Sequence, residues 1–163
     1  MTTMMGEARA LLATRRFALV GVSRDPKDFS RGVLRDLLAR GYDVVPVNPG
    51  GGVVEGRPLA TSVGAIAPPV AGAIFMTPSE RTGGAVREAL AAGVKHVWLH
   101  RGGGPGAASE DALAACRAAG VVPITGLCPY MALPDAGWAH RLHAFFRRGD
   151  ARRVVEAGPE ART

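Results

Sequence analysis

Residues 17–33 read FALVGVSRDPKDFSRGV, and this stretch predicts a buried strand, a turn on Gly21 and a loop that leads into a helix. Its first four residues, and Val22 just past the turn, are apolar without alternation. Such a run is typical of a strand covered on both faces in a parallel sheet. The loop after it carries hydroxyl groups and cations, on Ser23, Arg24, Lys27, Ser30 and Arg31.

This loop is a candidate anion site. Where a strand enters a helix through small residues, free backbone N–H groups and the positive end of the helix dipole converge. Hydroxyls and cations in the same loop suit a phosphate group better than a carboxylate. The alternative is an ordinary strand-to-helix turn with solvated basic residues, because small-residue loops are common in this architecture.

The rest of the chain alternates strands with helices. Apolar runs predict four more strands, at residues 43–47, 72–76, 95–99 and 121–125. Apolar stripes with helical spacing predict helices over residues 2–14, 30–40, 78–92, 106–119 and 138–148. For the third of these helices, Thr77 is the expected N-cap, Pro78 the first helical residue and Glu80 the partner in a capping box.

This alternation predicts an α/β fold, a single Rossmann-like doubly wound domain with a mainly parallel sheet of five to six strands. We expect the domain to span residues 1–150, including a C-terminal helix, and residues 151–163 to form a polar tail. Ligands of such sheets bind beyond the carboxyl ends of the strands. The loops there hold much of the chain's Gly, Pro and hydroxyl residues, which favours a functional role for the first loop.

Composition bounds the function further. The chain has 163 residues, 47% of them apolar, and a net charge of +6 that comes almost entirely from arginine. The sequence contains no apolar run long enough to span a membrane and no signal segment, so we expect a cytoplasmic protein without a membrane partner. No recognition-helix or RNA-platform motif accompanies the charge, so no nucleic-acid partner is expected. His140 and His143 lack a third ligand nearby, so no metal site is predicted.

The nucleotide class can be narrowed. The dinucleotide fingerprint requires three glycines after the strand and an acidic residue about 20 residues later. Only Gly21 fits, and Asn48 stands where the acid is expected, which disfavours NAD. NADP stays open, because Arg24 or Arg57 could meet a 2′-phosphate. The alternative function is therefore an NADP-binding oxidoreductase or redox sensor.

Five short motifs occur together, in this order: Gly21-Val22-Ser23 with Ser30-Arg31, Pro46-Val47-Asn48-Pro49, Thr77-Pro78, Trp98-Leu99-His100 with its glycine loop, and Leu127-Cys128-Pro129. In order and spacing the chain resembles the small stand-alone CoA-binding domain proteins, which are similar to the N-terminal domain of the succinyl-CoA synthetase α subunit. The resemblance covers about residues 11–133.

The resemblance implies a role for each matching position in binding coenzyme A or an acyl-CoA. Gly21, Val22 and Ser23 would contact the nucleotide phosphates, with Ser30 and Arg31 adding a hydroxyl and a cation. Asn48 and Pro49 would border the adenosine. The pantetheine path would be lined by Met76, Thr77, Pro78, Leu99 and His100. Coenzyme A also carries a 3′-phosphate, which Arg24, Lys27 and Arg31 would bind together. The alternatives are that Asn48-Pro49 is only a turn, Thr77 only a cap, and Met76 and Leu99 strand-end core.

Catalysis is not expected from this chain alone. The synthetase's second domain, with its phosphorylated histidine, has no counterpart here. Cys128 is the candidate nucleophile, on a loop at the ligand-facing edge, but no acid–base partner is evident in the sequence. The resemblance thus implies a CoA-binding protein without intrinsic catalysis. The sequence leaves open a homodimer or an association with a partner enzyme subunit.

Overall fold

This computed structural model describes residues 3–100 and 106–134. The chain divides into two compact units, Met1–Pro129 and Tyr130–Thr163. Every strand of the described residues lies in the first unit. The predicted helix over residues 138–148 and the predicted polar tail lie outside the described residues.

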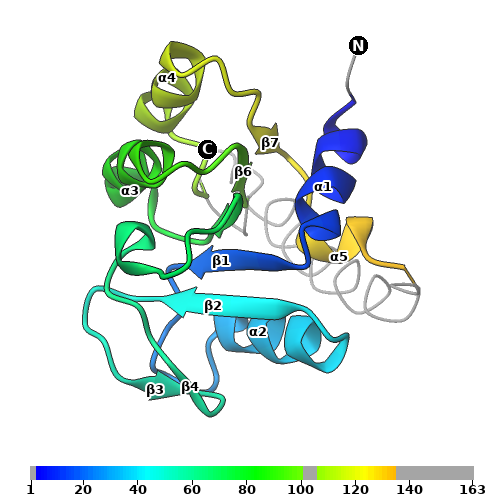
Figure 1. Ribbon diagram of the computed structural model, residues 1–163, viewed down its shortest axis with the longest axis vertical. Coiled ribbons are helices and arrows are strands. Elements are labelled where there is room, and N and C mark those ends of the chain that lie inside the picture. Colours follow the sequence, from blue (N-terminus) through cyan, green and yellow to red (C-terminus); the bar gives the residue numbers. More distant parts are fainter. Residues whose placement is uncertain (1–2, 101–105, 135–163) are drawn as a thin grey trace, which may run out of the picture. The chain divides into compact units, whose positions relative to one another are not determined.

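Five parallel strands form the central sheet (Figure 1). In chain order they are β1 (Arg16–Val20), β2 (Asp43–Val47), β5 (Gly72–Phe75), β6 (His96–Leu99) and β7 (Ile124–Thr125). Their order across the sheet is β2-β1-β5-β6-β7, so the chain first adds a strand on one side of β1 and then continues on the other. The predicted Rossmann-like α/β fold is confirmed. Its switch point lies at the carboxyl ends of β1 and β5, where ligands of such sheets bind.

Helices and one hairpin complete the described chain. The helices are α1 (Met4–Ala13), α2 (Phe29–Ala39), η1 (Val63–Ala65), α3 (Ser79–Ala91), α4 (Glu110–Ala118) and α5 (Pro129–Ala132). The short antiparallel hairpin consists of β3 (Val53–Val54) and β4 (Arg57–Pro58). It follows the edge strand β2 in the chain.

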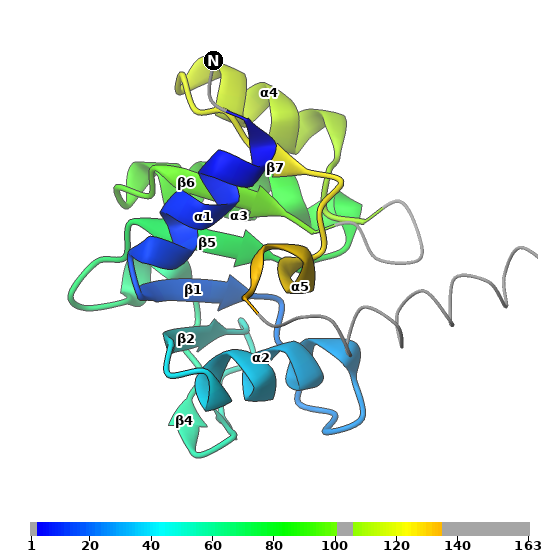
Figure 2. The same ribbon diagram turned by 90° about the vertical axis from the view of Figure 1, so that its right-hand side faces the viewer.

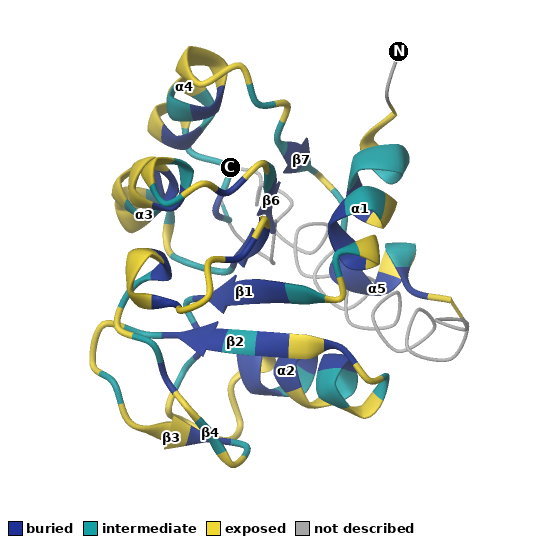
Figure 3. Ribbon diagram, in the orientation of Figure 1, coloured by how far each residue is buried: buried dark blue, intermediate teal, exposed yellow. Residues whose placement is uncertain are grey.

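Both faces of the sheet are covered, as the non-alternating strands predicted. Figures 1 and 2 show α1 on one face and α3 with α4 on the other. Ala18, Val20 and Phe75 point into a core shared with α3 and α4, whereas Gly72 lies directly against Leu11 of α1. The central strands are accordingly buried along most of their length (Figure 3).

Two prolines limit the sheet at its edges. Pro46 lies inside β2, where only an edge strand tolerates a residue that lacks an N–H group. The strand predicted for residues 121–125 is reduced to Ile124–Thr125. Pro123 precedes it and cannot donate to the ladder, and Val122 is exposed, so pairing with β6 begins only after these residues.

Candidate functional site

The loops after β1 and β5 meet at the switch point. Gly21 follows β1 with a φ of +90°, and an added Cβ would stand 3.0 Å from the carbonyl carbon of Met76 and from the nitrogen of Thr77. The Gly21 N–H donates to the carbonyl of Val47 (3.0 Å), so the turn is also attached to the end of β2. A glycine is therefore required where three strand ends converge.

The β1–α2 loop, residues 21–28, is held by its own side chains. The Ser23 N–H donates to Ser30 Oγ (2.9 Å), the Asp25 N–H to Ser23 Oγ (3.1 Å) and the Lys27 N–H to Asp25 Oδ1 (2.9 Å). Asp28 caps α2 by accepting from the Ser30 N–H, and it also accepts from the Ser30 hydroxyl. The Ser30 hydroxyl predicted to meet a phosphate is thus buried and engaged within the loop.

Asn48 joins the β1–α2 loop to the loop after β2. Its Nδ2 donates to the carbonyl of Val22 (2.8 Å), and its Oδ1 accepts from the N–H of Gly50 (2.8 Å). Val22 itself is fully buried, so this residue presents only its backbone to Asn48. Pro49 and Gly50 are exposed beside this junction. Asn48 is therefore more than part of a turn, because one side chain sets the distance between two loops.

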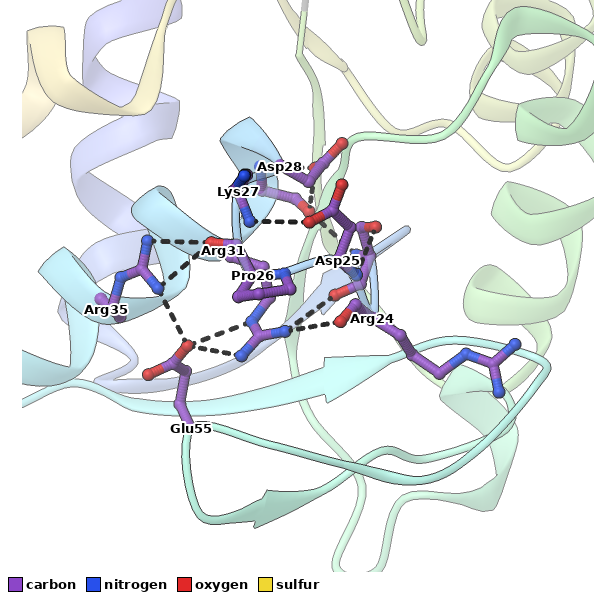
Figure 4. Close-up of polar contacts among 10 residues, drawn as sticks. Arg24, Asp25, Pro26, Lys27, Asp28, Arg31, Arg35 and Glu55 are labelled. Atoms are coloured by element: carbon purple, nitrogen blue, oxygen red, sulfur yellow. Dashed lines mark hydrogen bonds and ion pairs between the residues drawn. The ribbon is translucent and has the colours of Figure 1, made fainter.

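Arg24 extends over the Asn48–Gly52 loop. A Cβ added to Gly50 would stand 3.3 Å from Arg24 Cζ, and one added to Gly52 would stand 3.8 Å from Arg24 Cδ. Figure 4 shows the guanidinium directed away from Arg31 and toward this loop. The side chains of Arg24 and Lys27 are exposed, and neither forms an ion pair with another described residue.

Arg31 is paired inside the protein. Its Nε and Nη2 donate to Glu55 Oε1 (3.1 and 2.6 Å), and its Nη1 donates to the carbonyls of Arg24 (3.1 Å) and Ser23 (3.5 Å) (Figure 4). Arg35 Nη1 reaches the same Glu55 oxygen at 3.2 Å. The hydrogen bond from Arg31, followed by the positive charges of Arg31 and Arg35, lowers the pKa of Glu55. Of the three cations predicted to read a 3′-phosphate, Arg31 is the one committed to a carboxylate.

We expect this pairing to appear in the acid stability of the protein. A lowered folded-state pKa contributes stability that is fully present above the ordinary value of 4.5 and is lost as pH falls through the folded value. As pH falls from 5 to below the folded-state pKa of Glu55, wild type should therefore lose more thermal stability than the Glu55→Gln variant loses. Thermal melts of both proteins across this pH range measure the difference. Parallel curves would show that the pair does not stabilise the fold.

The loop after β5 corrects one prediction. The predicted capping box of Thr77 and Glu80 is wrong, because Pro78 is the N-cap of α3 and no side chain bonds to its free amides. Thr77 Oγ1 instead pairs with Thr82 Oγ1 at 2.6 Å, and Thr82, fully buried, also donates to the Pro78 carbonyl (2.9 Å). The hydroxyl of Thr77 is thus turned toward α3. Met76 and Thr77 are half-buried beside Gly21, and Pro78 is exposed.

The end of β6 contributes an aromatic contact. The His100 N–H donates to the carbonyl of Phe75 (3.0 Å), and its ring stacks on Phe29 with centroids 5.6 Å apart. Phe29 is the first residue of α2, so the stack connects the start of α2 with the end of β6. Leu99 is fully buried in the core beside α3 and α4, as expected for strand-end core. The glycine loop at residues 101–105 lies outside the described residues.

The predicted positions fall into four groups. Those that meet at the switch point or stack beside it are Gly21, Val22, Ser23, Arg24, Asn48, Met76, Thr77 and His100. Ser30 and Arg31 support the loop from within, and Leu99 belongs to the core. Lys27, Pro49 and Pro78 are exposed nearby in the chain.

Sequence reasoning missed Asp28, Phe29 and Glu55. Asp28 could have been found, because Asp is a preferred helix N-cap and it stands just before the helix predicted over residues 30–40. Glu55 precedes Gly56 between two short valine- and proline-containing segments, a pattern typical of a hairpin turn. Nothing in the sequence links Phe29 to His100, which is 71 positions away.

Metal ligands and thiols among the described residues are the next feature. They contain no group of three His, Cys, Asp or Glu that could hold a metal ion, and none of their helices is long and apolar enough to cross a membrane. Cys116 is buried, and burial raises the pKa of its thiol. Cys128 is half-buried. A raised pKa disfavours the nucleophilic thiolate at Cys116.

Comparison with known proteins identifies the family. The CoA binding domain model matches residues 15–134. A conserved hypothetical protein from Pyrococcus furiosus is 35% identical, with 70% of this chain and 95% of that chain covered at a TM-score of 0.63. A hypothetical protein from Pyrococcus horikoshii OT3 is 28% identical, with 80% of this chain and 89% of that chain covered at a TM-score of 0.71. An acetyl-coenzyme A synthetase from Ca. Korarchaeum cryptofilum is 25% identical at a TM-score of 0.58, where 67% of this chain matches only 25% of the synthetase. The chain belongs to the CoA binding domain family.

Proposed function

We propose that this protein binds coenzyme A or an acyl-CoA across the switch point of its sheet, without chemistry of its own. Family membership supports the ligand class, and the convergence of the β1, β2 and β5 loops supports the location. The observation that carries the proposal is the position of Arg24 over the Asn48–Gly52 loop.

That position suits a phosphorylated ribose. In doubly wound sheets the residue at the end of the second strand reads the ribose, and an acid there selects an unmodified hydroxyl. Here the neutral Asn48 stands at this point, and an added Cβ at Gly50 would stand 3.2 Å from Asn48 Oδ1 and 3.3 Å from Arg24 Cζ, so the two side chains lie close together. An arginine fork matches the oxygens of a phosphate group better than any other side chain. The 3′-phosphate of coenzyme A supplies such a group.

NADP also carries a phosphate on its ribose, but one of the two arginines that we expected to meet this 2′-phosphate is engaged elsewhere. Arg57 donates to Asp43 Oδ1 at 2.6 Å. Asp43 is the first residue of β2, so this pair lies at the opposite end of the strand from Asn48. Only Arg24 could then serve a 2′-phosphate. We therefore keep NADP as a test ligand rather than as a second proposal.

The remaining parts of the ligand have supporting groups as well. The exposed Lys27, in the β1–α2 loop, would face the pyrophosphate. Beyond it, the half-buried Met76 and the Phe29–His100 stack offer apolar surface for the pantetheine arm. An acyl-CoA carries the same nucleotide, so the proposal covers both ligands.

Arg24→Ala is expected to weaken coenzyme A binding about 10- to 100-fold, the value of one charge-assisted contact to phosphate. Dephospho-CoA, which lacks the 3′-phosphate, should bind wild type and the variant alike. Isothermal titration with coenzyme A, dephospho-CoA and NADP measures these affinities. Arg9→Ala is the matched control, because it removes an exposed arginine on α1 and should change nothing. Equal affinity of wild type for coenzyme A and dephospho-CoA would refute the role of Arg24, and tighter binding of NADP would favour the redox function.

A further inference from the structure

We infer that Glu55, at the tip of the β3–β4 hairpin, is a positioning residue that fixes the β1–α2 loop through Arg31 and so sets the direction of Arg24. Glu55 contacts neither the loop backbone nor the proposed ligand position. It acts from a separate element that lies 24 positions away from Arg31 in the chain. The effect on Arg24 rests on the proposed function, whereas the effect on the loop does not.

Arg31 connects the two elements. Two of its nitrogens donate to Glu55 Oε1, and the third donates to the carbonyls of Ser23 and Arg24 (Figure 4). The side chain of Arg31 is only 10% exposed, so solvent cannot easily replace either set of contacts. The carbonyl that Arg31 holds belongs to Arg24 itself, the residue whose side chain extends toward Asn48–Gly52. Fixing this carbonyl fixes the backbone from which Arg24 departs.

The backbone conformation of Glu55 also supports this positioning role. Glu55 and Gly56 have φ values of +49° and +71° between the paired residues of the hairpin. Two-residue hairpin turns with positive φ at both positions favour Asn, Asp or Gly at the first, because other residues are strained there. A glutamate breaks this local preference, and its carboxylate meets two arginines. A residue that violates a local rule and makes a specific distant contact is the pattern expected of a functional position.

Without the carboxylate, Arg31 would be a largely buried cation with only carbonyl partners. Such a group turns toward any anion or toward water, because its desolvation is no longer compensated. The carbonyls of Ser23 and Arg24 would then lose their donor. Arg35 also reaches this loop, at the carbonyl of Pro26 (3.4 Å), but it is half-exposed, and the carbonyls of Ser23 and Arg24 are held by Arg31. The loop would gain freedom while the sheet beneath it stays intact.

The first test needs no ligand. Amide hydrogen exchange is measured at Ser23, Asp25 and Lys27 in wild type, Glu55→Gln and Asp43→Asn. Exchange at these amides should accelerate on the order of tenfold in Glu55→Gln and stay unchanged in the control. The control is matched because Asp43 also pairs with two arginines and undergoes the same carboxylate-to-amide change. Protection in β1 and β5 shows that each variant is folded. Unchanged exchange in Glu55→Gln would overturn the inference.

A second variant covers the case in which Glu55→Gln does not fold. Arg31→Lys keeps a positive charge beside Glu55 but lacks the fork that reaches both the carboxylate and the loop carbonyls. The same acceleration of exchange is expected. If the loop amides of Arg31→Lys exchange as in wild type, charge alone holds the loop and the bridging role is wrong.

The second test uses coenzyme A and dephospho-CoA as ligands. Glu55→Gln should lower coenzyme A affinity on the order of tenfold, with dephospho-CoA affinity within about twofold of wild type, because only the contact of Arg24 is misdirected. In an Arg24→Ala background, Glu55→Gln should cause no further loss. An equal loss for both ligands would mean a merely structural role and would refute the effect on Arg24. If wild type binds neither ligand, the proposed function fails, and the exchange experiment alone decides whether Glu55 positions the loop.

Discussion

Gly21→Ala is expected to abolish detectable coenzyme A binding and to lower the free energy of unfolding by about 2–4 kcal/mol. Two costs add at this position. The φ of +90° is strained for any residue with a Cβ, and that Cβ would press on the backbone of Met76 and Thr77 at 3.0 Å. Backbone atoms in adjoining strands cannot move aside as a flexible side chain can. Separation of the β1 and β5 loops would open the switch point where the ligand is proposed to bind.

Gly32→Ala is the matched control for this prediction. Gly32 lies in α2, its φ is not positive, and an added Cβ would meet no atom within 4 Å. Alanine is favoured over glycine in a helix interior, so this variant should gain about 0.5–1 kcal/mol. Chemical denaturation of both variants and titration with coenzyme A measure the contrast. If Gly21→Ala binds coenzyme A as wild type does, the ligand does not use the convergence of these loops.

The sheet could be predicted from sequence because its signal is dense. Phe17–Val20 is apolar at every position, and β2 coincides with its predicted range of residues 43–47. Strands buried on both faces require such runs, so the pattern and the physical cause are the same. The strand at residues 121–125 was overestimated, because hydrophobicity alone does not show where a proline ends the pairing.

Hydrogen-bond partners were harder to predict. The sequence Thr77-Pro78-Ser79-Glu80 fits a capping box, yet the buried hydroxyl of Thr82 takes Thr77 as its partner instead. Capping is a local preference of about 1 kcal/mol, and the cost of leaving a buried hydroxyl without a partner is at least as large. Whether the capping preference or the partner of the hydroxyl prevails depends on burial. The burial of Thr82 cannot be predicted from the local sequence.

The same limit applies to the cations of the site. Three cations looked equivalent in the sequence because each carries a positive charge in the same predicted loop. They are Arg24, Lys27 and Arg31. Their environments differ: Arg31 is paired with a glutamate from another element, whereas Arg24 extends over the loop after β2. A pairing across 24 positions leaves no local pattern, although a glutamate at a turn position that favours Asn, Asp or Gly is a usable signal. Under the proposed function, the predicted cations become one arginine that would face the phosphate and a second that supports it.

Asn48→Asp is expected to lower the free energy of unfolding by about 1–3 kcal/mol and to weaken coenzyme A binding about 10- to 100-fold. The amide of Asn48 donates to the carbonyl of Val22 and accepts from Gly50. A carboxylate can only accept, so an oxygen would replace the donor and face the Val22 carbonyl without a hydrogen bond. The new negative charge would also lie near Arg24, beside Gly50, where it would pair with the guanidinium that the ligand phosphate needs.

Asn48→Ala separates these two effects. It removes both hydrogen bonds without adding a charge, so its loss of stability should be similar and its loss of coenzyme A affinity smaller. The affinity difference between the two variants should shrink at high salt, because a partly exposed charge is screened there. It should also be nearly absent for dephospho-CoA, since that ligand makes no demand on Arg24. If the two variants bind coenzyme A equally at low salt, Arg24 does not read a phosphate at this position, and the ribose end of the proposed site must be placed elsewhere.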